Sequence, residues 1–247
     1  MRILAFDTAT RATAAALWDS EAAGRAIEVR DDPRPGERPR HAAILLRSIV
    51  ELLERGSVSW GDVDRIAVGV GPGTFTGLRI GIATAKALSR SRGIPLVGVS
   101  TLESLALGAL LPGRVSERPS AVAAVIDARR REVFAAGWRL SSDTCDALAA
   151  ERRFLEPRAL GPADLAQRLR AIGSRVLALG DGAVEFRVVL ERSGASIPDD
   201  DSELHRVSAI NHCRLATGLR AGAPDEIRPE YLRVPDAEIA VRATRST

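Results

Sequence analysis

Aromatic side chains are scarce in this sequence: they make up 4% of its 247 residues, and only one of them is a tyrosine. Proteins that bind single-stranded nucleic acid on their own use such side chains as platforms on which bases stack. Basic residues are plentiful, but all except Lys86 are arginine, and 32 acidic residues reduce the net charge to +3. We therefore expect no autonomous nucleic-acid binding, in spite of a sequence pI of 9.4.

Cysteine and long apolar runs are also rare. The two cysteines, Cys145 and Cys213, lie far apart and form no metal-type or redox-type pair. No uncharged apolar stretch approaches the ~20 residues that a membrane-spanning helix needs. The first residues reach Asp7 too early for the apolar segment of a signal peptide. These absences predict a cytoplasmic protein without a membrane segment.

The first half of the sequence alternates between apolar runs of strand length and segments with helical periodicity, which is typical of an α/β unit. A charged, proline-rich stretch at 31–40 is expected to be a loop. The expected strands lie at 2–7, 13–18, 26–30, 65–70 and 95–99, and the expected helices at 41–55 and 76–90.

The second half begins like the first. After a break at 111–119, an apolar run again ends in an aspartate, and an offset of 120 residues aligns Asp7 with Asp127 and Trp18 with Trp138. We interpret this as an internal duplication that gives two ribonuclease-H-like or actin-like α/β lobes, each a mixed sheet with helices. The lobes are expected at 1–112 and 113–247, with the option that the last helix packs back on the first lobe. Further elements are expected as strands at 121–127, 133–138, 175–179 and 229–233, and helices at 162–171 and 204–221.

Each lobe opens with a strand that ends in an aspartate at a turn. In proteins of this plan, backbone N–H groups of such turns hold phosphate oxygens, and a carboxylate holds magnesium. Asp7, Thr8, Asp127 and Arg129 are therefore candidate nucleotide-binding residues. Neither aspartate is followed by the glycine that lets a phosphate approach closely. We therefore expect a nucleotide site that is vestigial or that is completed at a partner interface. The alternative is that the two aspartates only cap their turns and bind no nucleotide.

A glycine-rich segment at 69–81 follows a strand and opens a helix. It lacks the Lys-Ser or Lys-Thr pair of a Walker A loop and the spacing of a dinucleotide fingerprint. The helix that follows is apolar on nearly all sides, and the helix at 41–55 has a broad apolar stripe. Such helices are buried either on their own sheet or against another chain. Their apolar surface exceeds what one sheet face needs, which favours a partner.

Several motifs, in order along the chain, resemble the TsaB family: 3–10, 71–81, 98–102, 126–129 with 132–134, and 229–233. The resemblance implies a non-catalytic scaffold or activating subunit. It would pair with the paralogous transferase TsaD, and with the ATPase TsaE, to form N6-threonylcarbamoyladenosine in tRNAs that read codons starting with adenine. It also implies a homodimer when TsaD is absent, and contact with tRNA only through the complex.

The family's interface uses two helices of the first lobe. We assign to it the residues of these helices and of the glycine-rich turn that carry the family motif or the apolar stripe: His41, Leu45, Ile49, Thr74, Phe75, Gly77, Leu78, Ile80, Gly81, Ala83, Thr84 and Ala87.

Metal binding is not expected. TsaD proteins carry two metal-binding histidines four residues apart, and the corresponding positions here are Thr101 and Leu105, neither of them a strong metal ligand. His205 and His212 would share one face of a helix, but ~10 Å apart along its axis. His41 begins a helix and is expected to be a surface or capping residue.

The sequence thus predicts no metal, no cofactor and no catalysis. It also lacks the Gly-x-Ser-x-Gly elbow of one class of hydrolases. The alternative hypothesis is an ATP-dependent phosphotransferase or hydrolase of the actin-like fold, which would use Asp7 and Asp127 across the cleft.

Overall fold

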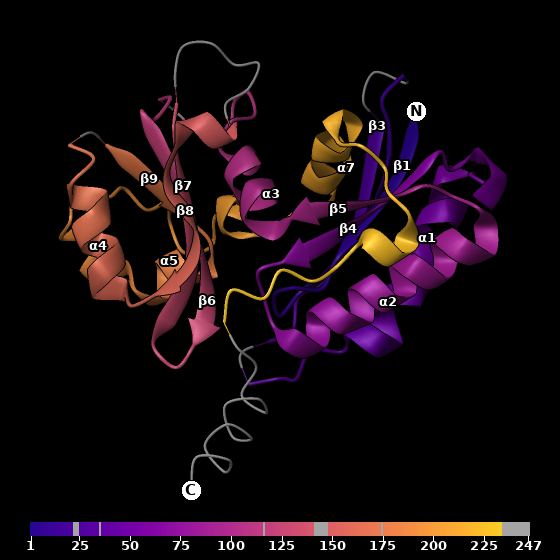
Figure 1. Cartoon of the computed structure of the whole chain (residues 1–247), viewed down its shortest axis with the longest axis horizontal. Helices are drawn as coiled ribbons and strands as arrows, with labels where there is room; N and C mark the ends of the chain where they lie inside the picture. The colour runs from indigo at the N-terminus through magenta and orange to yellow at the C-terminus, as the bar shows by residue number, and fades with distance from the viewer. Residues whose placement is uncertain (22–24, 35, 116, 141–147, 174, 234–247) are drawn as a thin grey trace, which may run out of the picture.

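The computed structural model describes residues 1–21, 25–34, 36–115, 117–140, 148–173 and 175–233. Two sheets stand side by side with helices between and around them (Figure 1). This is the α/β arrangement of two mixed sheets that the sequence predicts.

The first sheet has the strand order β3-β2-β1-β4-β5. β1 and β2 form an antiparallel hairpin, β3 continues it, and β4 and β5 add to β1 in parallel. The strands are β1 (Arg2–Asp7), β2 (Thr13–Asp19), β3 (Arg25–Asp31), β4 (Arg65–Gly71) and β5 (Leu96–Ser100), all within about a residue or two of the expected bounds.

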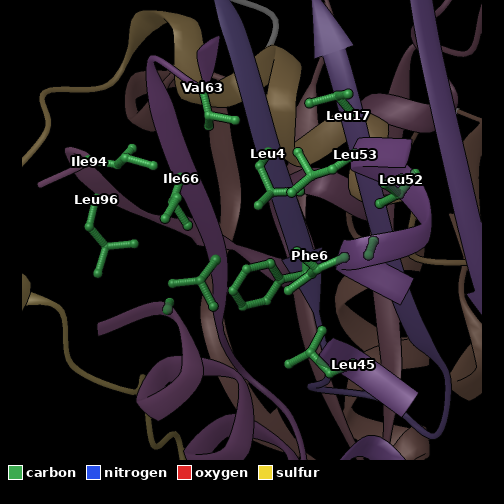
Figure 2. Close-up of a cluster of buried hydrophobic side chains, with 14 of the residues drawn as sticks. Leu4, Phe6, Leu17, Leu45, Leu52, Leu53, Val63, Ile66, Ile94 and Leu96 are labelled. Atoms are coloured by element: carbon green, nitrogen blue, oxygen red, sulfur yellow. The ribbon is translucent and has the colours of Figure 1, made fainter. Parts of the chain in front are cut away.

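Helices α1 (His41–Gly56) and α2 (Phe75–Arg92) cover one face of this sheet. α1 lies over β2 and β3, and its residues Leu45, Ile49 and Leu52 belong to the same buried cluster as Leu4 and Phe6 of β1. Figure 2 shows Leu45 and Leu52 in this cluster with Leu4 and Phe6. Each is at most 1% exposed. Burial of one such side chain contributes about 1.5–3 kcal/mol, so this contact fixes α1 to the sheet.

The opposite face is covered by α7 (Ala209–Gly218), which comes from the second half of the chain. Its small residues Ala209, Cys213 and Ala216 pack against Ile3 and Ala5. The predicted helix 204–221 is wrong in its extent. Residues Glu203–His205 form a separate 3-10 turn, η3, and α7 begins only where Glu28 of β3 accepts the Ala209 N–H.

The second sheet has the order β8-β7-β6-β9. One face carries α4, α5 and α6, and the other faces the first lobe across α3, which lies between the sheets (Figure 1). The strands are β6 (Ala121–Arg129), β7 (Glu132–Arg139), β8 (Arg153–Leu160) and β9 (Val176–Leu179), and the helices are α3 (Thr101–Gly108), α4 (Pro162–Arg170), α5 (Asp181–Glu185) and α6 (Arg187–Glu191).

Four of these elements are not predicted from the sequence. β8 contains Pro157 and charged residues, a composition that only an edge strand tolerates. The helices α3, α5 and α6 have eight residues or fewer and show little periodicity. Short 3-10 turns, η1 (Trp60–Asp62), η2 (Ala150–Arg152) and η4 (Pro224–Glu226), complete the described elements.

The predicted strand at 229–233 is wrong. These residues form no strand in the described structure, although the Glu230 N–H donates to the Val70 carbonyl over 2.7 Å. β4 already pairs with β1 on one side and β5 on the other, and Val70 lies where the pairing with β5 shifts in register. Within the ranges described, no helix is long and apolar enough to cross a bilayer.

Candidate functional site: the Asp7 turn and the outer face of the first lobe

Asp7 lies at the end of β1 and is only 1% exposed. Its Oδ1 accepts the Ala9 N–H over 2.7 Å, and its Oδ2 accepts the Thr101 hydroxyl over 2.9 Å. A Cβ at Gly69 would lie 1.8 Å from Oδ2, so the neighbouring strand leaves no space there. The carboxylate that the sequence offers for magnesium is therefore surrounded by protein groups.

The charge of Asp7 faces His212 of α7. His212 Nε2 lies 3.0 Å from Asp7 Oδ2, although its N–H does not point straight at the oxygen. The other ring nitrogen, Nδ1, lies 2.8 Å from Ser104 Oγ and 3.1 Å from the Ser208 carbonyl. All four side chains in direct contact here, those of Asp7, Thr101, Ser104 and His212, are buried.

These contacts set the ionisation of Asp7. Burial alone raises the pKa of the carboxyl, but His212, the Ala9 N–H and the Thr101 hydroxyl outweigh burial and hold the pKa below its ordinary value. Asp7 is thus a buried carboxylate whose stabilising partners all come from its own chain.

Thr8 and the glycine-rich segment are joined directly. Thr8 Oγ1 donates to the Gly77 carbonyl over 2.7 Å. A Cβ at Gly77 would lie 1.9 Å from the Thr8 carbonyl oxygen, and one at Gly73 would lie 2.3 Å from that of Ala9. The glycines let the first turn of α2 press against the Asp7 turn, so this side of α2 is used for packing within the chain.

The turn of the second lobe is more open. The Arg129 N–H donates to Asp127 Oδ1 over 2.8 Å, and Arg129 Nη1 lies 3.1 Å from Asp127 Oδ2. Arg129, Arg130 and Arg131 have φ values of 64°, 55° and 61° and form the exposed tip of the β6–β7 hairpin. The Asp127 carboxylate therefore binds its own turn.

Asp181 accepts the Asp127 N–H over 3.0 Å. Enclosure by protein raises the pKa of Asp181 to about 6, although the residue still reaches solvent. It opens onto a cavity of about 180 Å³ between the lobes. The lining includes Thr10, Arg11, His205 and Arg206. None of Asp7, Thr8, Asp127 or Arg129 lines it, so the structure does not gather the four predicted nucleotide-binding residues around this cavity.

The predicted interface residues divide into two sets. The buried set is His41, Leu45, Ile49, Gly77, Leu78 and Gly81. Phe75, Ala83 and Ala87 are exposed, and Thr74, Ile80 and Thr84 are half-buried. These six lie along α2 and its N-cap.

Two exposed apolar residues of α1 were not assigned to the interface. Leu46 is 53% exposed and Val50 is 50% exposed. They lie four residues apart, just beyond Leu45 and Ile49, so the sequence signal was a stripe wider than the buried face requires. We call Leu46, Val50, Phe75, Ala83 and Ala87, together with the half-buried Ile80, the outer face.

An aromatic cluster lies at the N-terminal end of α2. The rings of Phe75 and Tyr231 are 5.3 Å apart, and the Arg79 guanidinium lies 3.7 Å above the Phe75 ring. Arg79 Nε also donates to the Tyr231 hydroxyl over 3.4 Å. The C-terminal part of the chain therefore reaches the end of the outer face.

The histidines differ from expectation. His41 is buried and lies 2.9 Å from the Thr13 hydroxyl, so its assignment as a surface or capping residue is wrong. His205 lies in η3 and His212 in α7, so they do not share a helix. Thr101 and Leu105 are both buried. In the part of the chain that the structure describes, no three His, Cys, Asp or Glu side chains are grouped to hold a metal.

Comparison with known proteins agrees with the fold and the motifs. Residues 36–168, more than half of the chain, match the family model of TsaD, tRNA N6-adenosine threonylcarbamoyltransferase. The chain is 29% identical to the tRNA threonylcarbamoyladenosine biosynthesis protein TsaB of Escherichia coli K12, with 94% of this chain and 95% of that protein covered. It is 26% identical to the Bacillus subtilis protein of the same name, with 96% of each covered.

A solved structure gives the same result. The crystal structure of an uncharacterized Pseudomonas aeruginosa protein with similarity to peptidase YEAZ matches with a TM-score of 0.72 and 29% identity. The match covers 94% of this chain and 99% of that one. From the family model, the full-length relatives and this structural match, we conclude that the chain belongs to the TsaD-type threonylcarbamoyltransferase family and, within it, to the TsaB proteins.

Proposed function

We propose that this chain acts in the biosynthesis of threonylcarbamoyladenosine in tRNA as a non-catalytic subunit. It docks through the outer face onto a TsaD-like paralogue that performs the transfer, and a TsaE-like ATPase joins the pair. Contact with tRNA occurs through the complex, and the free chain forms a homodimer. The relatives named TsaB support the pathway, and the geometry supports the division of labour.

The observation that carries the proposal is the closure of the Asp7 turn. A carboxylate that holds magnesium needs an open side, whereas both oxygens of Asp7 are in contact with Ala9, Thr101 or His212. A metal ion would have to displace buried protein partners, at a cost of several kcal/mol for the imidazole left unpaired.

A hydrolytic role is disfavoured by the same geometry. Ser104, His212 and Asp7 stand in the order of a serine hydrolase triad, with a Ser104 Oγ to His212 Nδ1 distance of 2.8 Å. All three side chains are buried, and the Ser104 hydroxyl donates a hydrogen bond to the Ser208 carbonyl. A nucleophile needs a free path to the carbonyl that it attacks, and Ser104 has none.

The partner is argued from the outer face. Leu46, Val50 and Phe75 are large exposed apolar side chains, and together with Ala83 and Ala87 they follow two adjacent helices. Apolar patches of this kind on a small protein are characteristic of protein–protein contacts. α1 and α2 fall within residues 36–168, which match the transferase model itself. A paralogue with the same helix pair can therefore pack against it, helices on helices.

The test is a reconstitution. TsaD-like and TsaE-like proteins of the same source receive tRNA, ATP and threonylcarbamoyl-adenylate, with and without this chain, and modified adenosine and complex size are measured. We expect modification to require the chain and a complex to form. Equal modification without the chain, with no complex, would contradict the proposal. Magnesium-dependent ATP binding or turnover by the chain alone would support the phosphotransferase alternative instead.

A further inference from the structure

Residues 222–233, which we call the strap, run along the first lobe without forming a strand or an α-helix. The Gly222 N–H donates to the Leu96 carbonyl over 3.1 Å, and the Glu230 N–H donates to that of Val70 over 2.7 Å. Between these points Ile227 packs against the core beneath α1 and α2. The strap (yellow in Figure 1) is thus fixed to the first lobe at the start of β5 and at the end of β4.

The end of the strap contacts the second lobe. Leu232 packs against the apolar cluster that α3 forms with β6 and β7. Arg233 Nη1 lies 3.0 Å from Glu132 Oε2 at the start of β7. The strap therefore connects the lobes independently of the chain between α3 and β6.

Tyr231 lies between these two sets of contacts and extends the outer face. It is 41% exposed, and its ring and hydroxyl contact Phe75 and Arg79 of α2. Tyrosine and arginine are the residue types that most often dominate the energy of protein interfaces. A partner that covers Phe75 must also meet Tyr231.

We propose that the strap couples docking on the outer face to the position of the second lobe, with Tyr231 as part of the docking surface. The inference rests on the proposed function, because the partner is the TsaD-like paralogue. The two states are a strap held on both lobes and a strap released from Glu132 and from the cluster around Leu232. A partner that buries Tyr231 favours the held state over the released state by some factor. Because such coupling is reciprocal, the released state binds the partner more weakly than the held state by that same factor.

The chain offers a site-specific probe, because Tyr231 is its only tyrosine. Labelling with 3-fluorotyrosine gives one fluorine resonance, which reports on the strap. The variants are Glu132→Arg, Arg233→Glu, their combination, and Leu232→Ala, which removes the apolar anchor without a change of charge. The matched control is Glu117→Arg, which reverses another exposed ion pair of the second lobe, to Arg175 at 2.5 Å.

We expect Glu132→Arg, Arg233→Glu and Leu232→Ala each to shift the free-chain resonance and to weaken binding of the TsaD-like paralogue by about three- to fivefold, the scale of one exposed ion pair. The charge-swapped double variant should recover wild-type affinity, and Glu117→Arg should keep it. Unchanged affinity and resonance in Glu132→Arg and Leu232→Ala would overturn the coupling and leave the proposed function standing. Failure of the wild-type chain to bind would overturn the proposed function and the coupling with it.

Discussion

His212 Nε2 lies 3.0 Å from Asp7 Oδ2, and both side chains are buried. This pair joins α7 to the end of β1, two elements from opposite ends of the sequence. The loss of one partner of such a buried pair leaves the other polar group without its partner, and this costs more than the pair itself contributes to stability. The relationship can therefore be tested by removing either partner.

His212→Ala should destabilise the chain by about 3 kcal/mol, because it leaves the buried Asp7 carboxylate without its imidazole partner. Urea unfolding measures the loss. In a double-mutant cycle, Asp7→Asn combined with His212→Ala should cost clearly less than the sum of the single changes. Strict additivity would show that the two groups do not interact.

Mildly acid pH should weaken the fold through His41. Burial lowers the pKa of His41 and outweighs the nearby carboxylates of Asp7 and Asp31. The unfolded imidazole, with a pKa of about 6.5, then binds protons that the folded one does not. The contribution of His41 to the free energy of unfolding is fully present above pH ~6.5. It falls as the pH drops below that value, by at most about 1.4 kcal/mol per pH unit.

Unfolding by urea at pH 7.5 and 5.5 measures this effect. His41→Gln should lose less stability than the wild type between the two values, because glutamine binds no proton. An equal loss in both proteins would assign the pH dependence to other groups.

Ala83→Glu should abolish docking on the TsaD-like paralogue while the chain stays folded, because Ala83 is exposed in the middle of the outer face. Ile80→Arg should have the same effect with some loss of stability, since Ile80 also packs against the core. Size-exclusion chromatography and thermal unfolding separate the two effects. Val188→Glu is the matched control, because Val188 is 61% exposed on α6 of the second lobe. Intact docking of Ala83→Glu would move the interface elsewhere.

Gly77→Ala should cost more than ~2 kcal/mol, because the new methyl group would lie 1.9 Å from the Thr8 carbonyl oxygen and α2 would have to move away from the Asp7 turn. The measurement is urea unfolding. Gly218→Ala, at the end of α7 with open space around its Cβ position, is the control and should be neutral within about 1 kcal/mol. A neutral Gly77→Ala would mean that this contact is looser than the distance indicates.

The long periodic helices and the two hairpins could be predicted from the sequence because their signals are local. The apolar stripe of α1 is an example: it predicts a helix at 41–55, and the helix runs from His41 to Gly56. β8 and α3 were missed because Pro157 resembles a breaker and eight residues give little periodicity. These two elements are stabilised by contacts with the second sheet, which a local sequence pattern does not show.

The site was predictable only in part for the same reason. Asp7 was identified by its place after a strand, but its partner His212 could not be, since the contact exists only once α7 packs on the first sheet. Leu45 and Ile49 were assigned to the interface because periodicity identifies an apolar stripe without showing which part of it the sheet covers.

The packing of α7 on the first sheet also sets an order of events during synthesis. Ile3 and Ala5 leave the ribosome early, but the helix that covers them contains Ala209, Cys213 and Ala216. Until those residues emerge, one face of a nearly complete sheet is exposed to water and to other chains. A nascent chain stalled before α7 should therefore bind chaperones or aggregate, and the first lobe expressed alone should be insoluble.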